Sequence, residues 1–135
     1  MLAALPMIHR LVMSGGERTR AIHTKTQLII FIILSVRKSL TMTEIAGYIS
    51  SSREQATRAV APLADAGYVE RYTDPSNRTR IHIRLTEAGR SYWEESREKM
   101  RAVIDARLKA SLSDEECNEL EQAAATMIRL LRKLK

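Results

Sequence analysis

Cysteine and long apolar runs are scarce in this sequence, and each shortage excludes a class of protein. Cys117 is the single cysteine, so no internal disulfide is possible, and a reducing compartment is expected. The longest apolar run, residues 28–34, is far shorter than the about 20 residues that a membrane span needs. No Lys or Arg precedes the apolar start of the chain, and His9 and Arg10 follow it at once, which argues against a signal peptide. We therefore expect a soluble, cytoplasmic protein without a membrane partner.

Motifs that mark common catalytic and metal sites are also absent from the sequence. His9, His23 and His82 are scattered and no Cys-x-x-Cys is present, so no metal site is predicted. The sequence has neither a glycine-rich phosphate loop nor a Gly-x-Ser-x-Gly turn. We predict no catalytic residues, no cofactor and no enzymatic activity.

What the sequence does contain is a basic excess. Its 135 residues carry 22 Lys and Arg against 16 Asp and Glu, a formal net charge of +6 and a pI near 9.8. Such an excess favours a polyanionic partner, and the length suits one domain with a single core. Aromatic residues are only 4% of the chain and none lies among the basic residues 78–84, so single-stranded nucleic acid is disfavoured as that partner.

Helix starts are marked by a Ser or Thr followed three residues later by Glu or Gln, a pattern that satisfies free backbone N–H groups. It occurs at Thr24 with Gln27, Thr41 with Glu44, Ser52 with Gln55, and Ser113 with Glu116. Together with apolar spacing, it predicts helices over residues 24–36, 42–49 and 53–66 and a last helix after Ser113. A further helix is expected from Thr86 to about residue 110. A first helix over residues 1–13 is expected to be broken by Ser14-Gly15-Gly16.

Between the fourth and fifth of these expected helices, apolar and polar residues alternate with a period of two, which is typical of β-strands. Residues 68–72 and 80–85 predict two strands around the turn Asp74-Pro75-Ser76-Asn77. The alternation puts Ile81, Ile83 and Leu85 on an apolar inner face. The outer face carries Arg80, His82 and Arg84, of which the last two lie near the hairpin base and are expected to face solvent.

The predicted fold is therefore mainly α with a small β-hairpin (α+β). Residues 24–85 have the order of a winged helix-turn-helix, with a short turn between Ile49 and Ser52. We expect a single domain over 1–135, with residues 1–20 and 87–135 as terminal helices. Their apolar stripes lack a covering layer in one subunit, which favours a core shared between two subunits.

The segment from Leu40 to Arg90 resembles the core of the MarR family of bacterial transcriptional regulators. The resemblance rests on Leu40-Thr41 with residues 44–46, on residues 66–71, and on Leu85-Thr86-Glu87-Ala88-Gly89. It implies a homodimer whose N- and C-terminal helices interlock. It also implies a second motif helix in the major groove, a wing in the minor groove, and a response to small amphipathic or phenolic effectors or to oxidants.

The start of the helix at residue 53 is the predicted recognition site. Arg can read guanine and Gln can read adenine, while hydroxyl groups suit phosphate oxygens. The predicted DNA-binding residues of this helix are Ser51, Ser52, Arg53, Gln55, Thr57 and Arg58. In the wing, Arg78 and Arg80 are predicted to enter the minor groove, where the negative potential is enhanced.

Two features depart from the family pattern. Asn77 and Thr79 stand where relatives usually carry an acid that braces the wing and an Arg for the minor groove, so which Arg enters the groove is left open. Pro62 lies inside the recognition helix and is expected to kink it beyond the DNA-facing part.

Other assignments stay open at this point. Phe31, Tyr48, Tyr68 and Trp93 suit either an effector cleft or the core, and Cys117 is better explained by packing than by redox sensing. The best reading is a ligand-responsive repressor that binds a pseudo-palindromic duplex as a homodimer. The alternatives are a winged-helix protein-interaction module and a non-specific architectural DNA binder.

Overall fold

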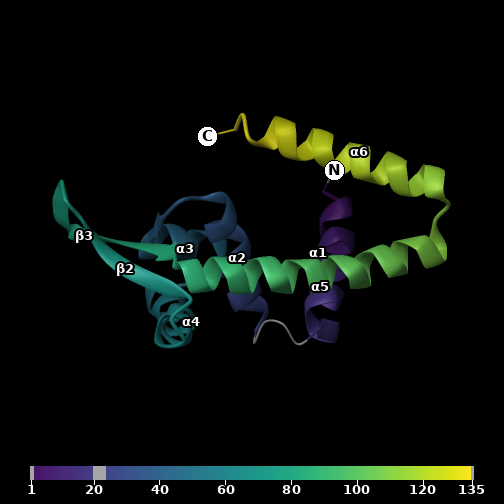
Figure 1. The fold of residues 1–135 in the computed structure, drawn as a ribbon. Coiled ribbons are helices and arrows are strands. Elements are labelled where there is room, and N and C mark those ends of the chain that lie inside the picture. Colours follow the sequence, from purple (N-terminus) through teal and green to yellow (C-terminus); the bar gives the residue numbers. More distant parts are fainter. Residues whose placement is uncertain (1, 20–23, 135) are drawn as a thin grey trace.

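The computed structural model describes residues 2–19 and 24–134, in which a small sheet lies at one end of a group of helices (Figure 1). The elements in chain order are α1 (Ala4–Thr19), α2 (Lys25–Val36), β1 (Leu40–Thr41), α3 (Met42–Tyr48), α4 (Arg53–Asp65), β2 (Val69–Asp74), β3 (Asn77–Leu85), α5 (Glu87–Ser111) and α6 (Asp114–Leu131). The predicted α+β winged helix-turn-helix is confirmed. No helix in the described residues combines the length and apolar character that crossing a bilayer requires.

Helix α2 is the centre of the core. Its residues are apolar nearly all round, a composition that suits a helix covered on several sides. Ile30 and Phe31 are fully buried, and they pack in one cluster with Ile45 of α3, Val60 of α4 and Ile83 of β3. The winged helix-turn-helix thus has a continuous apolar core within one chain.

The four helix starts predicted from capping residues are confirmed, because each cap hydroxyl accepts the expected backbone hydrogen bond. The hydroxyls of Thr24, Thr41, Ser52 and Ser113 each accept a hydrogen bond from the backbone N–H three residues later. At Ser113 the Glu116 side chain also accepts from the cap backbone N–H, which completes a capping box. The sequence pattern therefore located the helix starts, whereas the reciprocal side-chain bond forms fully at Ser113.

The prediction that Ser14-Gly15-Gly16 breaks the first helix is wrong, because α1 continues to Thr19. Glycine in a helix interior costs about 1 kcal/mol relative to Ala, which weakens a helix without ending it. Helix α1 also crosses α5, and Arg107 Nη1 donates a hydrogen bond of 2.9 Å to Ser14 Oγ at that crossing. Tertiary packing thus outweighs the local cost of the glycines.

The sheet has the order β1-β3-β2 and is antiparallel. Strand β1 was not predicted, because two residues show no alternation; Leu40 and Thr41 pair with Ile83 and His82. The prediction that Ile81 faces the core is wrong, since 46% of its surface is exposed. Pairing with β1 stops at His82, and among the described residues no third strand pairs with the hairpin beyond that point.

Hydrogen bonds and a close approach of two backbone segments join the start of the hairpin to α5. Thr86 N–H donates to Tyr68 O at 3.0 Å, and its hydroxyl donates to Gly67 O at 2.5 Å while capping Gly89 N–H. Gly67 has a φ of +81° and ends α4 as predicted. A Cβ at Gly89 would lie 1.8 Å from Tyr68 O, so only glycine permits this approach.

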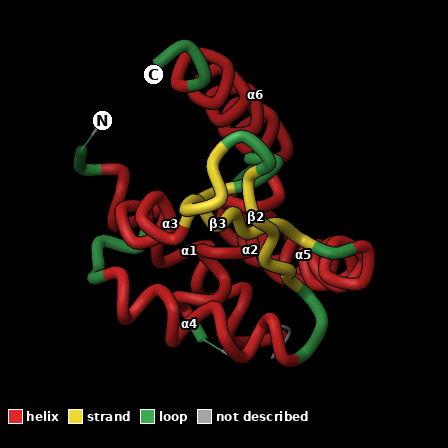
Figure 2. The backbone as a smooth tube through the Cα atoms, turned by 90° about the vertical axis from the view of Figure 1, so that its left-hand side faces the viewer, coloured by secondary structure: helices red, strands yellow, loops and turns green. Residues whose placement is uncertain are grey.

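The terminal helices are far less covered than the central ones. Helix α6 turns back from the end of α5 but lies apart from it along most of its length, and it contains no buried residue (Figures 1 and 2). Its predicted apolar stripe is largely exposed, and Leu120 and Leu131 expose 44% and 45% of their surface. On α1, Leu5 and Met7 are exposed as well. One chain therefore leaves apolar helix faces uncovered.

Candidate nucleic-acid interface

The turn between α3 and α4 sets the direction of the predicted recognition helix. Ser50 adopts a left-handed conformation with a φ of 51°, and Ser51 N–H donates to Ala46 O at 2.9 Å. This closes α3 in the manner of a Schellman motif. Ser52 follows in extended conformation and caps α4 by accepting from Gln55 N–H at 3.2 Å. The reversal takes four residues and leaves the N-terminus of α4 open to solvent.

Helix α4 has one buried and one exposed face. Ala56, Val60 and Leu63 are buried against the core, whereas Arg53, Gln55 and Arg58 are exposed. Within the described residues neither Arg53 nor Arg58 forms an ion pair, so both guanidinium groups keep their donors available for DNA. The helix runs through Pro62, which lies in its last turn and therefore behind this exposed start.

The other predicted residues of this helix are partly engaged by the protein itself. Ser51 Oγ donates to Gln55 Oε1, and Thr57 Oγ1 donates to Arg53 O at 2.9 Å. Ser52 Oγ is the helix cap. Contact with DNA by Gln55 therefore requires that its side chain leave Ser51, whereas the two arginines need no such rearrangement.

The wing is braced at its tip by side-chain oxygens. Asp74 Oδ1 accepts from Ser76 N–H at 2.9 Å and from Ser76 Oγ at 2.7 Å, and these bonds lower the pKa of Asp74. Asn77 Oδ1 likewise accepts from Thr79 N–H at 3.1 Å and from Thr79 Oγ1 at 2.6 Å. The amide at position 77 thus braces the tip locally by its carbonyl oxygen.

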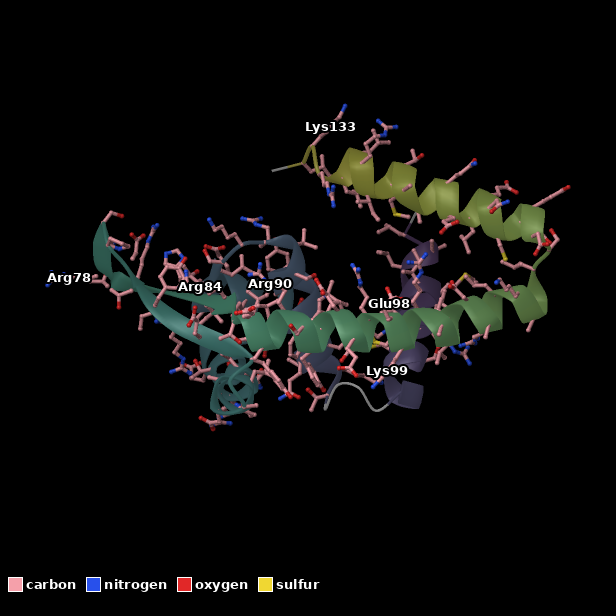
Figure 3. The ribbon with its side chains drawn as sticks, viewed as in Figure 1. Arg78, Arg84, Arg90, Glu98, Lys99 and Lys133 are labelled. Carbon is pink, nitrogen blue, oxygen red and sulfur yellow. The ribbon has the colours of Figure 1, made fainter. Side chains whose placement is uncertain are left out.

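The basic residues of the wing divide into two groups. Arg78 and Arg80 are exposed, and Figure 3 shows Arg78 at the outer end of the hairpin, directed away from the body. Arg84 lies nearer the body, where its Nε is 2.6 Å from Glu70 Oε1. The prediction that His82 faces solvent is wrong. Only 19% of its side chain is exposed, and its Nε2 lies 3.4 Å from Asp74 Oδ2.

The acidic and aromatic partners on β2 were missed by sequence reasoning. Glu70, Tyr72 and Asp74 alternate along β2 and lie opposite the basic face of β3. The same period of two that revealed the face of β3 was present in β2 and could have identified them. Within the described residues Arg78 and Arg80 at the tip form no ion pair, whereas Arg84 is paired with Glu70, and Arg71 of β2 is exposed as well.

The α4 start and the wing tip lie at the same end of the molecule. In Figure 1 both are at the end remote from the α5–α6 connection, and Figure 2 shows the hairpin and α4 on the side that faces the viewer. An α-helix fits the major groove of B-DNA, and basic side chains of a neighbouring hairpin can enter the minor groove. Among the described residues no cluster of His, Cys, Asp or Glu is suited to hold a metal ion.

A cleft of about 800 Å³ lies between the end of α2 and the first half of α5. Of the four aromatic residues considered as lining, only Trp93 contributes, because Phe31 is core, Tyr68 packs against that core and Tyr48 is half exposed on α3. The cleft combines an apolar wall with cations, and its lining residues are Leu34, Ser35, Val36, Leu85, Arg90, Trp93, Glu94, Arg97 and Arg132.

Comparison with known proteins agrees with this geometry. The sequence profile of the MarR family matches residues 23–81. No curated protein matches the sequence significantly. Wild-type MarR from E. coli in its apo form has a similar structure, with a TM-score of 0.75 and 20% identity over 94% of this chain and 96% of that chain.

Two further similar structures are complexes with a ligand. The transcriptional repressor CouR, bound to a 23-mer DNA duplex, gives a TM-score of 0.70 and 20% identity over 93% of this chain and 89% of that chain. NadR in complex with 4-hydroxyphenylacetate gives a TM-score of 0.68 and 22% identity over 93% and 89%. At these identities the likeness shows the fold.

Proposed function

We propose that the chain is a cytoplasmic regulator of transcription that binds double-stranded DNA, because residues 23–81 match the sequence profile of the MarR family. The single observation that carries the proposal is the arrangement of free cations. Arg53 and Arg58 of α4 and Arg78 and Arg80 of the wing tip are exposed at one end of the molecule. We assign DNA contacts to the α4 start, with Arg53, Gln55 and Arg58 on base edges and the hydroxyls of Ser51, Ser52 and Thr57 on phosphate oxygens, and a minor-groove contact to at least one of the wing arginines Arg78 and Arg80.

The second part of the proposal is a homodimer with residues 1–20 and 87–135 at its interface. The exposed apolar residues of α1 and α6 are the observation that supports it. A two-fold dimer presents two copies of α4, so the operator is expected to be pseudo-palindromic with half-sites about one helical turn apart. Repression follows if the bound dimer occludes the promoter, as the description of CouR as a repressor suggests by analogy.

The third part concerns an effector. The cleft beside Trp93 joins apolar surface with Arg90, Arg97 and Arg132, which suits a small amphipathic anion. The NadR complex with 4-hydroxyphenylacetate supports this class of ligand by analogy. Such a molecule changes DNA binding only by its differential affinity for the two arrangements of the dimer.

The test is a fluorescence-anisotropy titration with a duplex that the protein selects from a random-sequence pool and with a scrambled duplex. Measurements at two salt concentrations separate the candidate functions. We expect selective binding and a log Kd that rises steeply with log salt, because phosphate contacts release counterions. Equal affinity for both duplexes would indicate an architectural binder, and absent binding a protein-interaction module.

A further inference from the structure

One face of the wing carries an unbroken series of side-chain contacts from the hairpin base to its tip. Glu70 pairs with Arg84 at 2.6 Å, and the Arg84 guanidinium carbon lies 4.4 Å from the centre of the Tyr72 ring. The Tyr72 ring stacks on His82 with centroids 5.4 Å apart and planes 21° apart. His82 Nε2 then lies 3.4 Å from the Asp74 carboxylate. We call these five side chains the wing ladder.

The ladder ends on the turn that positions the DNA-contacting arginines. Asp74 receives His82 on Oδ2, while its Oδ1 accepts both hydrogen bonds from Ser76. The strand register shifts between Thr73 and Asp74, so this carboxylate sits where the regular pairing ends. A change in the ladder is therefore transmitted to the tip turn that precedes Arg78.

His82 controls the charge of the ladder. When its ring is neutral, the single cation Arg84 opposes the two carboxylates of Glu70 and Asp74, and the ladder carries a net charge of −1 beside the DNA-facing tip. Protonation of His82 removes this excess and adds an attraction to Asp74. Histidine is the side chain that ordinarily changes charge between pH 5 and 8.

The surroundings of His82 add one further cation, Arg80, and within the described residues no contacting carboxylate besides Asp74. On β3, Arg80 and Arg84 flank it two residues away along the same face, and on β2 it meets Tyr72 and Asp74. On β1 it pairs with Thr41, an uncharged residue whose hydroxyl donates to Glu44 of α3. The Asp74 carboxylate is thus the charged group in contact with the ring.

We propose that Tyr72 and His82 are positioning residues for DNA recognition: they hold the wing tip, and protonation of His82 strengthens DNA binding. Neither side chain needs to touch DNA, since both act through the Asp74 turn on Arg78 and Arg80. This inference rests on the proposed function, because it requires that the wing bind a duplex.

The first experiment measures Kd for the selected duplex from pH 8 to pH 6 at constant ionic strength. We expect the parent affinity to rise as the pH falls, by at most about tenfold per pH unit for each wing of the dimer, the limit for one linked proton. His82→Gln should abolish the dependence of affinity on pH. Asp74→Asn should reduce it, although the side-chain carbonyl oxygen of the new amide can still accept the hydrogen bonds from Ser76. His9→Gln, at a histidine exposed on α1, reports the pH dependence that does not originate in the wing. An unchanged pH slope in His82→Gln would overturn the proposal.

The second experiment compares Tyr72→Phe with Tyr72→Ser. The Phe variant keeps the stacked ring and should bind as the parent does. The Ser variant should lose about two- to fivefold in affinity, as expected for the loss of an exposed cation–π contact. Equal affinities of the two variants, both with parental thermal unfolding, would contradict a positioning role for the ring.

A third measurement needs no DNA and so separates this inference from the proposed function. Backbone ¹⁵N relaxation of residues 74–80 in the free protein should show a more ordered tip at pH 6 than at pH 8. His82→Gln should abolish that difference. If no duplex is selected, the proposed function fails, and a pH-independent tip order would overturn the ladder on its own.

Discussion

The winged helix-turn-helix and the terminal helices differ in how completely one chain buries them. Most of the buried apolar residues lie between Leu28 and Leu85, with Ile30, Leu40, Ile45 and Ile83 fully inaccessible. Helix α6, by contrast, has no buried residue and exposes several leucines. The difference teaches that the winged helix-turn-helix buries its core within a single chain, whereas the terminal helices carry apolar surface suited to pairing with a second copy.

The largest predicted effect concerns the junction of the two regions. Gly89→Ala would place a Cβ 1.8 Å from Tyr68 O, so the backbone of α5 or of residue 68 must move. We expect the free energy of unfolding to fall by at least about 3 kcal/mol, the upper end of ordinary overpacking. Urea denaturation followed by circular dichroism measures it.

The control for this change is Gly47→Ala. Gly47 is also helical, but a Cβ there would meet nothing within 4 Å. It should leave stability equal or slightly higher, because Ala favours the helix. Similar losses in both variants would show that the close approach at Gly89 does not limit stability.

The second prediction tests whether the terminal helices are incomplete in one chain. Ile128→Asp combined with Leu131→Asp puts two carboxylates on the exposed apolar face of α6. The dimer should weaken by at least about 2 kcal/mol, the loss typical of a central interface residue. Sedimentation velocity should detect monomers, with helicity retained. Glu121→Gln, an exposed polar change on the same helix, should leave the sedimenting mass of the protein unchanged. If the double variant is still a dimer, the interface lies on another surface.

The third prediction tests the winged helix-turn-helix. Arg58→Ala removes an unpaired guanidinium from α4 and should weaken specific binding by about 1–3 kcal/mol. The double change Arg78→Ala with Arg80→Ala should lower affinity with the dimer intact. Lys99→Ala on α5 is the control, because it removes an equal charge remote from α4 and the wing (Figure 3). If Arg58→Ala and Lys99→Ala have the same effect in anisotropy titrations, only overall charge matters.

The smallest expected effect lies in the α3–α4 turn. Ser50 has a φ of 51°, a conformation that glycine adopts without cost from a Cβ. Ser50→Gly should raise the free energy of unfolding by about 0.5–1 kcal/mol. Thermal unfolding measures the change, and Ser35→Gly in the last turn of α2 should destabilise instead. A loss at both positions would mean that Ser50 contributes contacts that outweigh its conformation.

Local chemistry explains which parts of the fold the sequence predicts. The caps at Thr24, Thr41, Ser52 and Ser113 bond within three residues, so spacing alone identifies them. The glycines of α1 misled the prediction, since the packing of α1 on α5 is a long-range effect. Strand β1 was missed because only its pairing with Ile83 and His82 defines it.

The candidate site divides in the same way. That Arg53 and Arg58 are exposed follows from the helical period, but the engagement of Gln55 by Ser51 requires coordinates. On the wing, alternation identified the face of His82 and Arg84. Their contacts with Asp74 and Glu70 depend on the register of β2 against β3, which the separate strand patterns do not specify.

Thr86 has a consequence for how the two regions can move. Its backbone N–H and hydroxyl tie the first turn of α5 to Tyr68 and Gly67, at the start of the hairpin. The N-terminus of α5 is therefore fixed to the winged helix-turn-helix, and the helix and this unit move together as one rigid lever. The 25 residues of α5 span about 37 Å at 1.5 Å per residue, so a tilt of about 5° at the far end would swing the whole reading head by about 3 Å. A change of that size in the spacing of two heads would need no rearrangement inside either one.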